Sequence, residues 1–210
     1  MFRLFIFLCF LVQIQQVKAQ EHTISNDQQL KTLTYDSLRK AFKSTIHMKP
    51  KLGKVYANAY YTKALEEKSK IEIYKGAHQY ALAYNKLGQK DSALYFIDVA
   101  LKESKKVNND QQYASSLYLK GNIYYSATNY IKAIKNYTKA YDIIQKDNDS
   151  IKLARIANSI ALIKNQIGET KQALNLSKQN LFFYERLDKK NESRLSDFDD
   201  IKAVLNISNA

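Results

Sequence analysis

Apolar and small side chains recur every three or four residues along most of the chain, a spacing that places them on one face of an α-helix. Between Tyr118 and Ala140, in YLKGNIYYSATNYIKAIKNYTKA, the pattern occurs twice, with a turn position at Thr128 between the two occurrences. The buried faces of the two expected helices comprise Leu117, Gly121 and Tyr124 in the first, and Ala133, Ile134, Tyr137 and Ala140 in the second. Gly and Ala let antiparallel helices approach closely, and a neighbouring aromatic ring fills the remaining space. The segment therefore predicts a packed helix pair.

This pattern returns every 40 residues, which indicates an internal repeat. Three segments superimpose at that offset: NKLGQKDSALYFIDVAL (85–101), YSATNYIKAIKNYTKAY (125–141) and NQIGETKQALNLSKQNL (165–181). Equivalent positions are Ala81, Gly121 and Ala161; Gly88, Thr128 and Gly168; Ala93, Ala133 and Ala173; and Leu94, Ile134 and Leu174. Each unit is expected to contain two helices joined by a tight turn at the Gly88, Thr128 or Gly168 position.

An earlier unit is indicated by KVYANAYYTKALEEK (54–68), which shows the second-helix pattern again. We place its Ala57 in register with Ala93, 36 residues later, and assign Leu38 and Phe42 to a shorter first helix. Composition agrees with an all-helical chain, because 5 Gly and 1 Pro among 210 residues are few for a protein rich in turns or sheets.

The signature-like positions Gly121, Tyr124, Ala133, Tyr137 and Ala140 resemble those of the tetratricopeptide repeat. The resemblance implies an all-α fold, a right-handed superhelical array of antiparallel helix pairs. The expected units are 34–68, 69–108, 109–148 and 149–187. The 40-residue period is longer than the usual 34 of this family.

The first 19 residues have the layout of a secretory signal peptide. Arg3 precedes the apolar run from Leu4 to Val12, and Val17-Lys18-Ala19 presents a small residue for cleavage after Ala19. Nine apolar residues are too few to cross a bilayer, which needs about 20. We therefore expect an exported, periplasmic protein in which residues 20–33 form a polar linker. Its one cysteine, Cys9, would be removed with the signal peptide, and the mature protein would have no disulfide.

Charge and motifs argue against nucleic-acid binding and catalysis. The formal net charge of +13 comes mostly from lysines spread along the chain and mixed with acidic residues, which is typical of a solvated helix surface. His22, His47 and His78 have no second metal ligand at metalloprotease spacing, and no GxSxG or glycine-rich phosphate loop occurs. The sequence therefore predicts no enzymatic activity, no cofactor, no metal and no nucleic-acid partner.

By resemblance to peptide-binding tetratricopeptide proteins, the first helix of each unit should line a concave groove that holds a protein or peptide ligand. The groove residues expected on those helices are Lys75, His78, Asn85, Ser115, Tyr118, Asn122, Tyr125, Arg155, Asn158 and Asn165. Asparagine can bond both polar groups of a peptide backbone, and Tyr118 and Tyr125 add apolar area. Exposed asparagines are also tolerated on any helix face, and Leu82 stands where a carboxylate-clamping relative would have Asn.

Signal peptide, repeats and lysine-rich composition together resemble the periplasmic sensory region of bacterial membrane-spanning regulators with AraC-type or histidine-kinase output. The alternative is a free periplasmic adaptor or scaffold protein. Residues 188–210 are expected to hold a connection and an incomplete further repeat, because the apolar positions Val204, Leu205 and Ile207 would lack a covering second helix. No membrane span is expected within this segment, and we expect a longer protein of which it is the N-terminal part.

Overall fold

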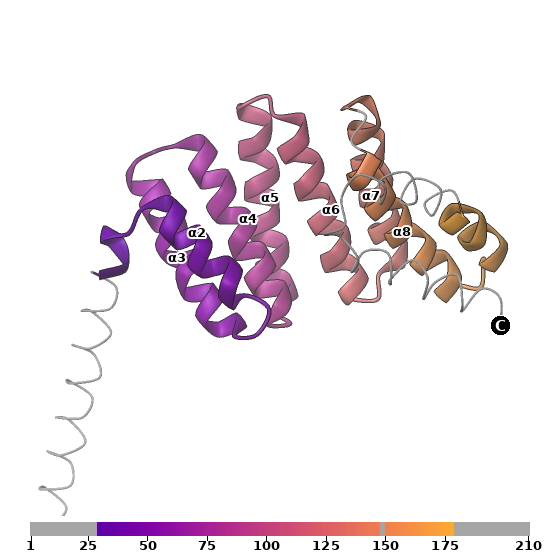
Figure 1. The fold of residues 1–210 in the computed structure, drawn as a ribbon, viewed down its shortest axis with the longest axis horizontal. Helices are drawn as coiled ribbons and strands as arrows, with labels where there is room; N and C mark the ends of the chain where they lie inside the picture. Colours follow the sequence, from indigo (N-terminus) through magenta and orange to yellow (C-terminus); the bar gives the residue numbers. More distant parts are fainter. Residues whose placement is uncertain (1–28, 148–149, 179–210) are drawn as a thin grey trace, which may run out of the picture.

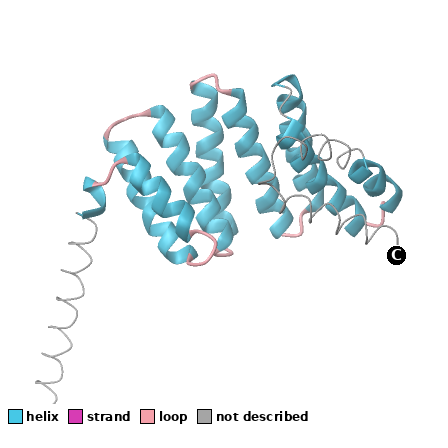
Figure 2. Cartoon of the chain, in the orientation of Figure 1, coloured by secondary structure: helices cyan, strands magenta, loops and turns pink. Residues whose placement is uncertain are grey.

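In the computed structural model, residues 29–147 and 150–178 are described, and their regular structure is entirely helical (Figure 2). The helices are α2 (Tyr35–Thr45), α3 (Pro50–Glu66), α4 (Lys70–Lys86), α5 (Lys90–Lys106), α6 (Asp110–Ser126), α7 (Tyr130–Ile144), the 3-10 turn η1 (Gln145–Asp147) and α8 (Ser150–Gln166). Residues 29–32 and 170–178 are also helical. The predicted signal peptide and the predicted incomplete repeat at 188–210 lie outside the described residues.

The helices stand side by side in a row along the longest axis of the molecule (Figure 1). From α2 to α8, each helix packs against the next one in the sequence, and α4 also contacts α6. Such neighbour-only packing is the organisation of a solenoid. The predicted fold class, an all-α array of antiparallel helix pairs, is confirmed. None of the described helices is long and apolar enough to span a membrane.

The 40-residue period is visible in the helix starts. The first helices α4, α6 and α8 begin at residues 70, 110 and 150, and the second helices α3, α5 and α7 begin at 50, 90 and 130. The offset between α3 and α5 is therefore also 40, and the expected 36-residue register of Ala57 with Ala93 is wrong. Pro50 starts α3 at a position where its missing N–H costs nothing, and Gly53 takes the place of Ala93. A Cβ on Gly53 would lie 3.0 Å from the Ile46 Cα, so this position also needs a small residue.

The connections repeat at half that period. Residues with positive φ follow the ends of five helices, namely Lys68, Gly88, Asn108, Thr128 and Gly168. They are spaced by 20 residues, except that the position between Thr128 and Gly168 in this series is residue 148, which lies outside the described residues. After each of them, the next N–H bonds back to a carbonyl five residues earlier, as in Gln89 N to Tyr84 O (2.9 Å). This is the Schellman arrangement, which pairs the last carbonyls of a helix. The turns predicted at Gly88, Thr128 and Gly168 thus belong to a longer series.

The core of the α6–α7 pair shows why small residues recur. A Cβ on Gly121 would lie 2.3 Å from the Tyr137 Cε1, so only glycine leaves room for this ring. Tyr137 is 2% exposed and Ala133 is fully buried. In the α4–α5 pair, the equivalent positions Ala81 and Ile97 are fully buried in one core cluster. The predicted pairing of a small residue with a neighbouring aromatic ring is therefore observed in the α6–α7 pair, whereas the α4–α5 pair has isoleucine in place of the ring.

Candidate functional site

A groove of about 590 Å³ crosses the first helices α2, α4 and α6. Its lining residues are Arg39, Phe42, Lys43, Ile46, His47, Tyr74, Lys75, His78, Gln79, Leu82 and Ser115. A smaller pocket of about 110 Å³ involves α6, α7 and α8 and is lined by Ala114, Ser115, Tyr118, Ile144, Lys152, Arg155 and Ile156. Both are lined by Ser115. We refer to them as the α2–α6 groove and the α6–α8 pocket.

Of the ten predicted groove residues, five line one or both of these cavities and five line neither. Lys75, His78 and Ser115 line the α2–α6 groove. Tyr118 and Arg155, again with Ser115, line the α6–α8 pocket. The other five, Asn85, Asn122, Tyr125, Asn158 and Asn165, line neither.

Several of the polar residues predicted for ligand binding instead bond to the adjacent first helix. The hydroxyl of Ser126 donates to Asn85 Oδ1 at 2.8 Å, which joins α4 to α6. The amide of Gln166 donates to the Tyr125 hydroxyl at 3.0 Å, and this bond joins α6 to α8. Both bonds connect residues 41 positions apart, one repeat plus one residue, as does the 3.1 Å contact between the hydroxyls of Tyr118 and Ser159. Each of these three contacts joins one first helix to the next.

Asn122 has a different role, within its own unit. Its Oδ1 accepts a hydrogen bond of 2.6 Å from the hydroxyl of Tyr137, the ring packed beside Gly121. Tyr137 is almost fully buried, so its hydroxyl needs a partner. Asn122 supplies that partner.

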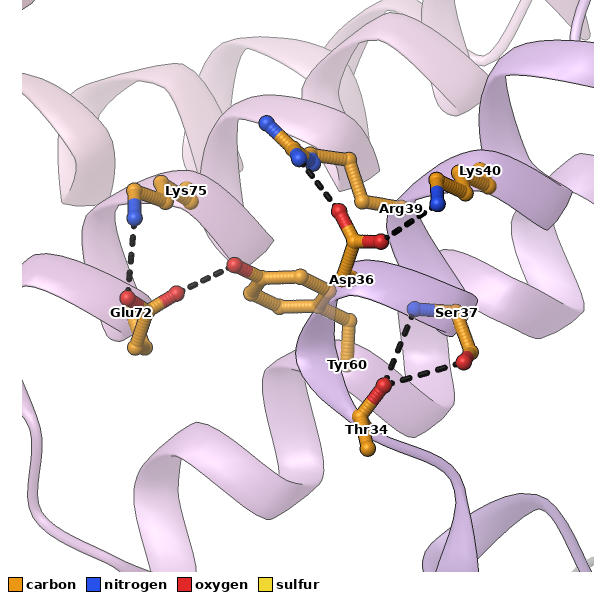
Figure 3. A network of polar contacts seen from close by, with 8 residues as sticks. All are labelled: Thr34, Asp36, Ser37, Arg39, Lys40, Tyr60, Glu72 and Lys75. Atoms are coloured by element: carbon orange, nitrogen blue, oxygen red, sulfur yellow. Dashed lines mark hydrogen bonds and ion pairs between the residues drawn. The ribbon is translucent and has the colours of Figure 1, made fainter.

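Two of the three Arg and Lys residues that line the α2–α6 groove, Arg39 and Lys75, pair with carboxylates (Figure 3). On α2, Arg39 pairs with Asp36, and on α4, the Lys75 Nζ lies 2.8 Å from Glu72 Oε1. The other oxygen of Glu72 accepts a hydrogen bond from the Tyr60 hydroxyl. Burial and this bond raise the pKa of Tyr60, so the hydroxyl stays protonated and continues to donate. Arg39 is thus paired within α2, and Lys75 is paired within α4 through a glutamate that also bonds to α3.

His78 and Gln79 bring buried polar atoms to the wall of the groove. His78 Nε2 and Gln79 Oε1 are buried and have no hydrogen-bond partner among the described residues. Burial lowers the pKa of His78 to about 4, against the opposing effect of the Ser115 backbone, so the ring is neutral near pH 7.

Sequence reasoning missed the contribution of α2 and of the residues that follow it. Arg39, Lys43 and His47 line the groove, but the sequence pattern had indicated only the buried residues Leu38 and Phe42 for this helix. The sequence contained a signal for Arg39 and Lys43. They lie one residue after Leu38 and Phe42, so they recur with the same helical period beside the buried face of α2. Extending the first-helix face to the shortest helix would have identified them.

In the described part of the chain, no cluster of three or more His, Cys, Asp or Glu side chains is placed to hold a metal ion.

Comparison with known proteins agrees with this architecture. Residues 112–181 match the family model described as Tetratricopeptide repeat. The chain is similar to the crystal structure of BtubC (BKLC) from P. vanneervenii, with a TM-score of 0.63 and 13% sequence identity over 83% of each chain. At that identity the likeness concerns the fold alone. No curated protein matches the sequence significantly. The family match supports tetratricopeptide repeats in this chain, and such repeats are typical of protein-protein interaction modules.

Proposed function

We propose that this protein is a non-enzymatic interaction module that binds a partner polypeptide in the α2–α6 groove. The observation that carries the proposal is the groove itself, which three successive first helices build together. In a helical repeat array this is the surface that several units share, so a ligand there gains contacts from each of them.

The lining of the groove suits a polypeptide side chain and backbone together. Phe42, Ile46 and Leu82 supply apolar surface, and Ser115, Gln79 and His78 supply hydrogen-bonding groups. Binding sites commonly combine a mostly apolar wall with a few placed polar groups.

We further propose that the array is exported and forms the ligand-binding N-terminal part of a membrane-spanning regulator. The support is the signal-peptide layout of residues 1–19 together with the repeat array that follows. Mass spectrometry of periplasmic protein tests export: an N-terminus at Gln20 is expected, and an intact Met1 there would contradict it. Reading the gene beyond codon 210 tests the regulator. Further repeats followed by about 20 apolar residues are expected, whereas a stop codon without them would favour the free adaptor.

Single-cysteine labelling tests the binding surface. Cys9 is the one cysteine of the sequence and precedes the expected cleavage site, so mature Ser115→Cys and Tyr95→Cys variants carry one thiol each. Ser115 lines both cavities, whereas Tyr95 on α5 is 65% exposed and lines neither. A bulky maleimide on residue 115 should abolish capture of the partners that the unlabelled protein retains from envelope extract. The same label on residue 95 should leave capture unchanged, and the opposite pattern would remove the groove from the proposal.

Alanine substitution of Tyr118, Asn122 and Tyr125 is a poorer test. These side chains bond to Ser159, Tyr137 and Gln166, so their loss would disturb the stacking of the helices as well as any ligand contact.

A further inference from the structure

We propose that one edge of the helical array docks peripherally on the surface of an anionic phospholipid bilayer. This edge contains the connections α2–α3, α4–α5 and α6–α7, which lie along the lower side of the array in Figure 2, and the connection that follows α8. The connections α3–α4 and α5–α6 lie on the opposite, upper side (Figure 2). The proposal goes beyond the binding of a polypeptide and does not depend on the α2–α6 groove.

We define the two edges by the connections and the helix starts that follow them. The lower edge comprises residues 47–55, 87–95, 127–135 and 167–175, and the upper edge comprises residues 67–75 and 107–115. Since the helices stand in a row along the longest axis of the molecule, each edge is an extended line of helix ends (Figure 1).

The first support is the distribution of exposed apolar side chains. Six of the seven large hydrophobic side chains that are exposed in the described part of the chain lie in the lower edge, namely Met48, Leu52, Val55, Tyr95, Ile131 and Ile167. The seventh, Leu65, lies in the last turn of α3, near the upper edge. Met48 and Ile131 are 86% and 84% exposed, so they can leave water for another apolar environment with little loss of contacts inside the protein.

The way in which these six side chains are arranged favours a bilayer over a folded protein. None of them lines the α2–α6 groove or the α6–α8 pocket. They are spread over four successive connections, so they form a row of separate apolar points and no hollow. Sites for protein partners are typically one contiguous apolar patch, whereas separate apolar side chains can enter the interfacial layer of a bilayer together.

The second support is charge. The first three segments of the lower edge have a net charge of +5, from one acidic residue, Asp91, and six lysines, Lys49, Lys51, Lys54, Lys90, Lys132 and Lys135. The two segments of the upper edge have three basic and three acidic residues and are neutral. The lysines of the lower edge therefore alternate with its exposed apolar side chains. Lysine stems can lie along apolar surface while their ammonium groups reach lipid phosphates, and each lysine near an anionic leaflet adds to the attraction.

The same charge argues against a second copy of the chain as the occupant. Two identical lower edges placed face to face would bring a net positive charge against a net positive charge. Lys51 and Lys135 are exposed and form no ion pair with a described residue, so no carboxylate of the described part of the chain neutralises them. An anionic lipid surface supplies both the apolar environment and the negative charge that this edge lacks.

Sedimentation with lipid vesicles tests the proposal. The mature protein should sediment with vesicles that mix phosphatidylglycerol with phosphatidylcholine, and it should stay in the supernatant with vesicles of phosphatidylcholine alone. No sedimentation with the anionic vesicles at physiological ionic strength would overturn the proposal, and equal sedimentation with both kinds of vesicle would overturn the requirement for an anionic surface.

A matched pair of double charge reversals then locates the docking surface. Lys51→Glu with Lys135→Glu changes the lower edge, whereas Lys70→Glu with Lys102→Glu makes the same change of charge at the first turn of α4 and the last turn of α5, on the upper side. All four lysines are exposed, and none forms an ion pair with a described residue. The lower-edge variant should bind anionic vesicles at least about tenfold more weakly, and the upper-edge variant should change by less than about twofold. Equal losses would show that overall charge, and not this edge, holds the protein on the vesicles.

A dye that responds to polarity tests insertion. Cys9 precedes the expected cleavage site, so mature Ile131→Cys and Leu65→Cys variants carry one thiol each. A nitrobenzoxadiazole dye on residue 131 should shift its emission to shorter wavelength when anionic vesicles are added, and the same dye on residue 65 should not. A shift at residue 65 alone would overturn the assignment of the lower edge.

Sedimentation velocity without lipid separates the bilayer from a second copy. The mature protein should be monomeric, and Met48→Ser with Ile131→Ser should leave it so while weakening its binding to vesicles. A dimer that this double substitution dissociates, in a protein that does not bind vesicles, would replace the bilayer by a second copy of the chain.

Discussion

The α4–α5 pair and the α6–α7 pair share one register, one connection geometry and one period, but they fill their inner contact differently. In the first pair Ala81 and Ile97 are both fully buried in the same cluster, and in the second Gly121 leaves space for Tyr137. Between the first pair and the second, the first helix loses the methyl group of Ala81, and the second helix has the ring of Tyr137 in place of Ile97. What repeats is therefore the total volume between the helices, because close packing tolerates neither a void nor an overlap.

The exchange also changes the polarity of the first helix. Tyr137 brings a hydroxyl that the buried Ile97 lacks, and Asn122 accepts its hydrogen bond. The position equivalent to Asn122 in the α4–α5 pair is Leu82, which lines the α2–α6 groove. A polar residue on the first helix can thus serve the core of its own unit, and its presence alone does not indicate a ligand contact.

The largest expected effect is the loss of the ring that distinguishes the two pairs. Tyr137→Ala should lower the free energy of unfolding by about 3–5 kcal/mol, because a buried aromatic ring leaves a cavity that rigid helices cannot close. Urea denaturation followed by circular dichroism measures it. Tyr95→Ala, at a tyrosine that is 65% exposed, is the matched control and should change stability by no more than about 0.5 kcal/mol. Similar losses in both variants would contradict the packing described for Tyr137.

The next largest effect concerns the combination of Gly121 with Tyr137. Gly121→Ala should destabilise the protein by about 1–3 kcal/mol, because the added methyl would overlap the Tyr137 ring. In a Tyr137→Ile background the same change restores the combination found in the α4–α5 pair. There, Gly121→Ala should be neutral or stabilising, since alanine also favours the helix by about 1 kcal/mol. Equal costs of Gly121→Ala in the two backgrounds would show that the positions are independent.

The smallest effect lies in the connections. The φ of Thr128 is +56° and that of Gly88 is +75°, a region that β-branched residues rarely occupy. Thr128→Gly should therefore stabilise the protein by about 0.5–1 kcal/mol, after the greater entropy of glycine in the unfolded chain is counted, and Gly88→Thr should destabilise it by about 1–2 kcal/mol. Thermal unfolding of both variants measures whether stability rises in Thr128→Gly and falls in Gly88→Thr. A loss of stability in Thr128→Gly would mean that the threonine side chain makes a contact worth more than the strain.

Much of the fold could be predicted because a helical repeat is determined locally. The spacing of Gly121, Ala133 and Tyr137 indicates a buried helix face, and the glycine at position 88 indicates a turn with left-handed backbone conformation. Lys68 and Asn108 adopt the same conformation without being glycine, so those turns were not identified. The register of α3 was misread because its alanines repeat at several spacings, whereas Pro50 marks the helix start unambiguously.

Less of the site could be predicted, because it depends on how the units stack. The helical period placed Lys75, His78 and Ser115 on one face of the first helices, and these three residues line the α2–α6 groove. It could not show that Asn85 and Tyr125 bond to residues 41 positions later, since that pairing is created by the distance and rotation between successive first helices. Residues shared between units are therefore the ones that sequence alone assigns least well.

Hydrogen–deuterium exchange of the mature protein, alone and with a saturating amount of the captured partner polypeptide, tests most directly whether the groove formed by the first helices is the binding surface. Since α2, α4 and α6 line the α2–α6 groove while α5 does not, amide exchange should slow in peptides from these three first helices and stay unchanged in α5. Slower exchange confined to α5 and α7, with α2, α4 and α6 unaffected, would place the partner on the opposite helices and contradict the proposed function.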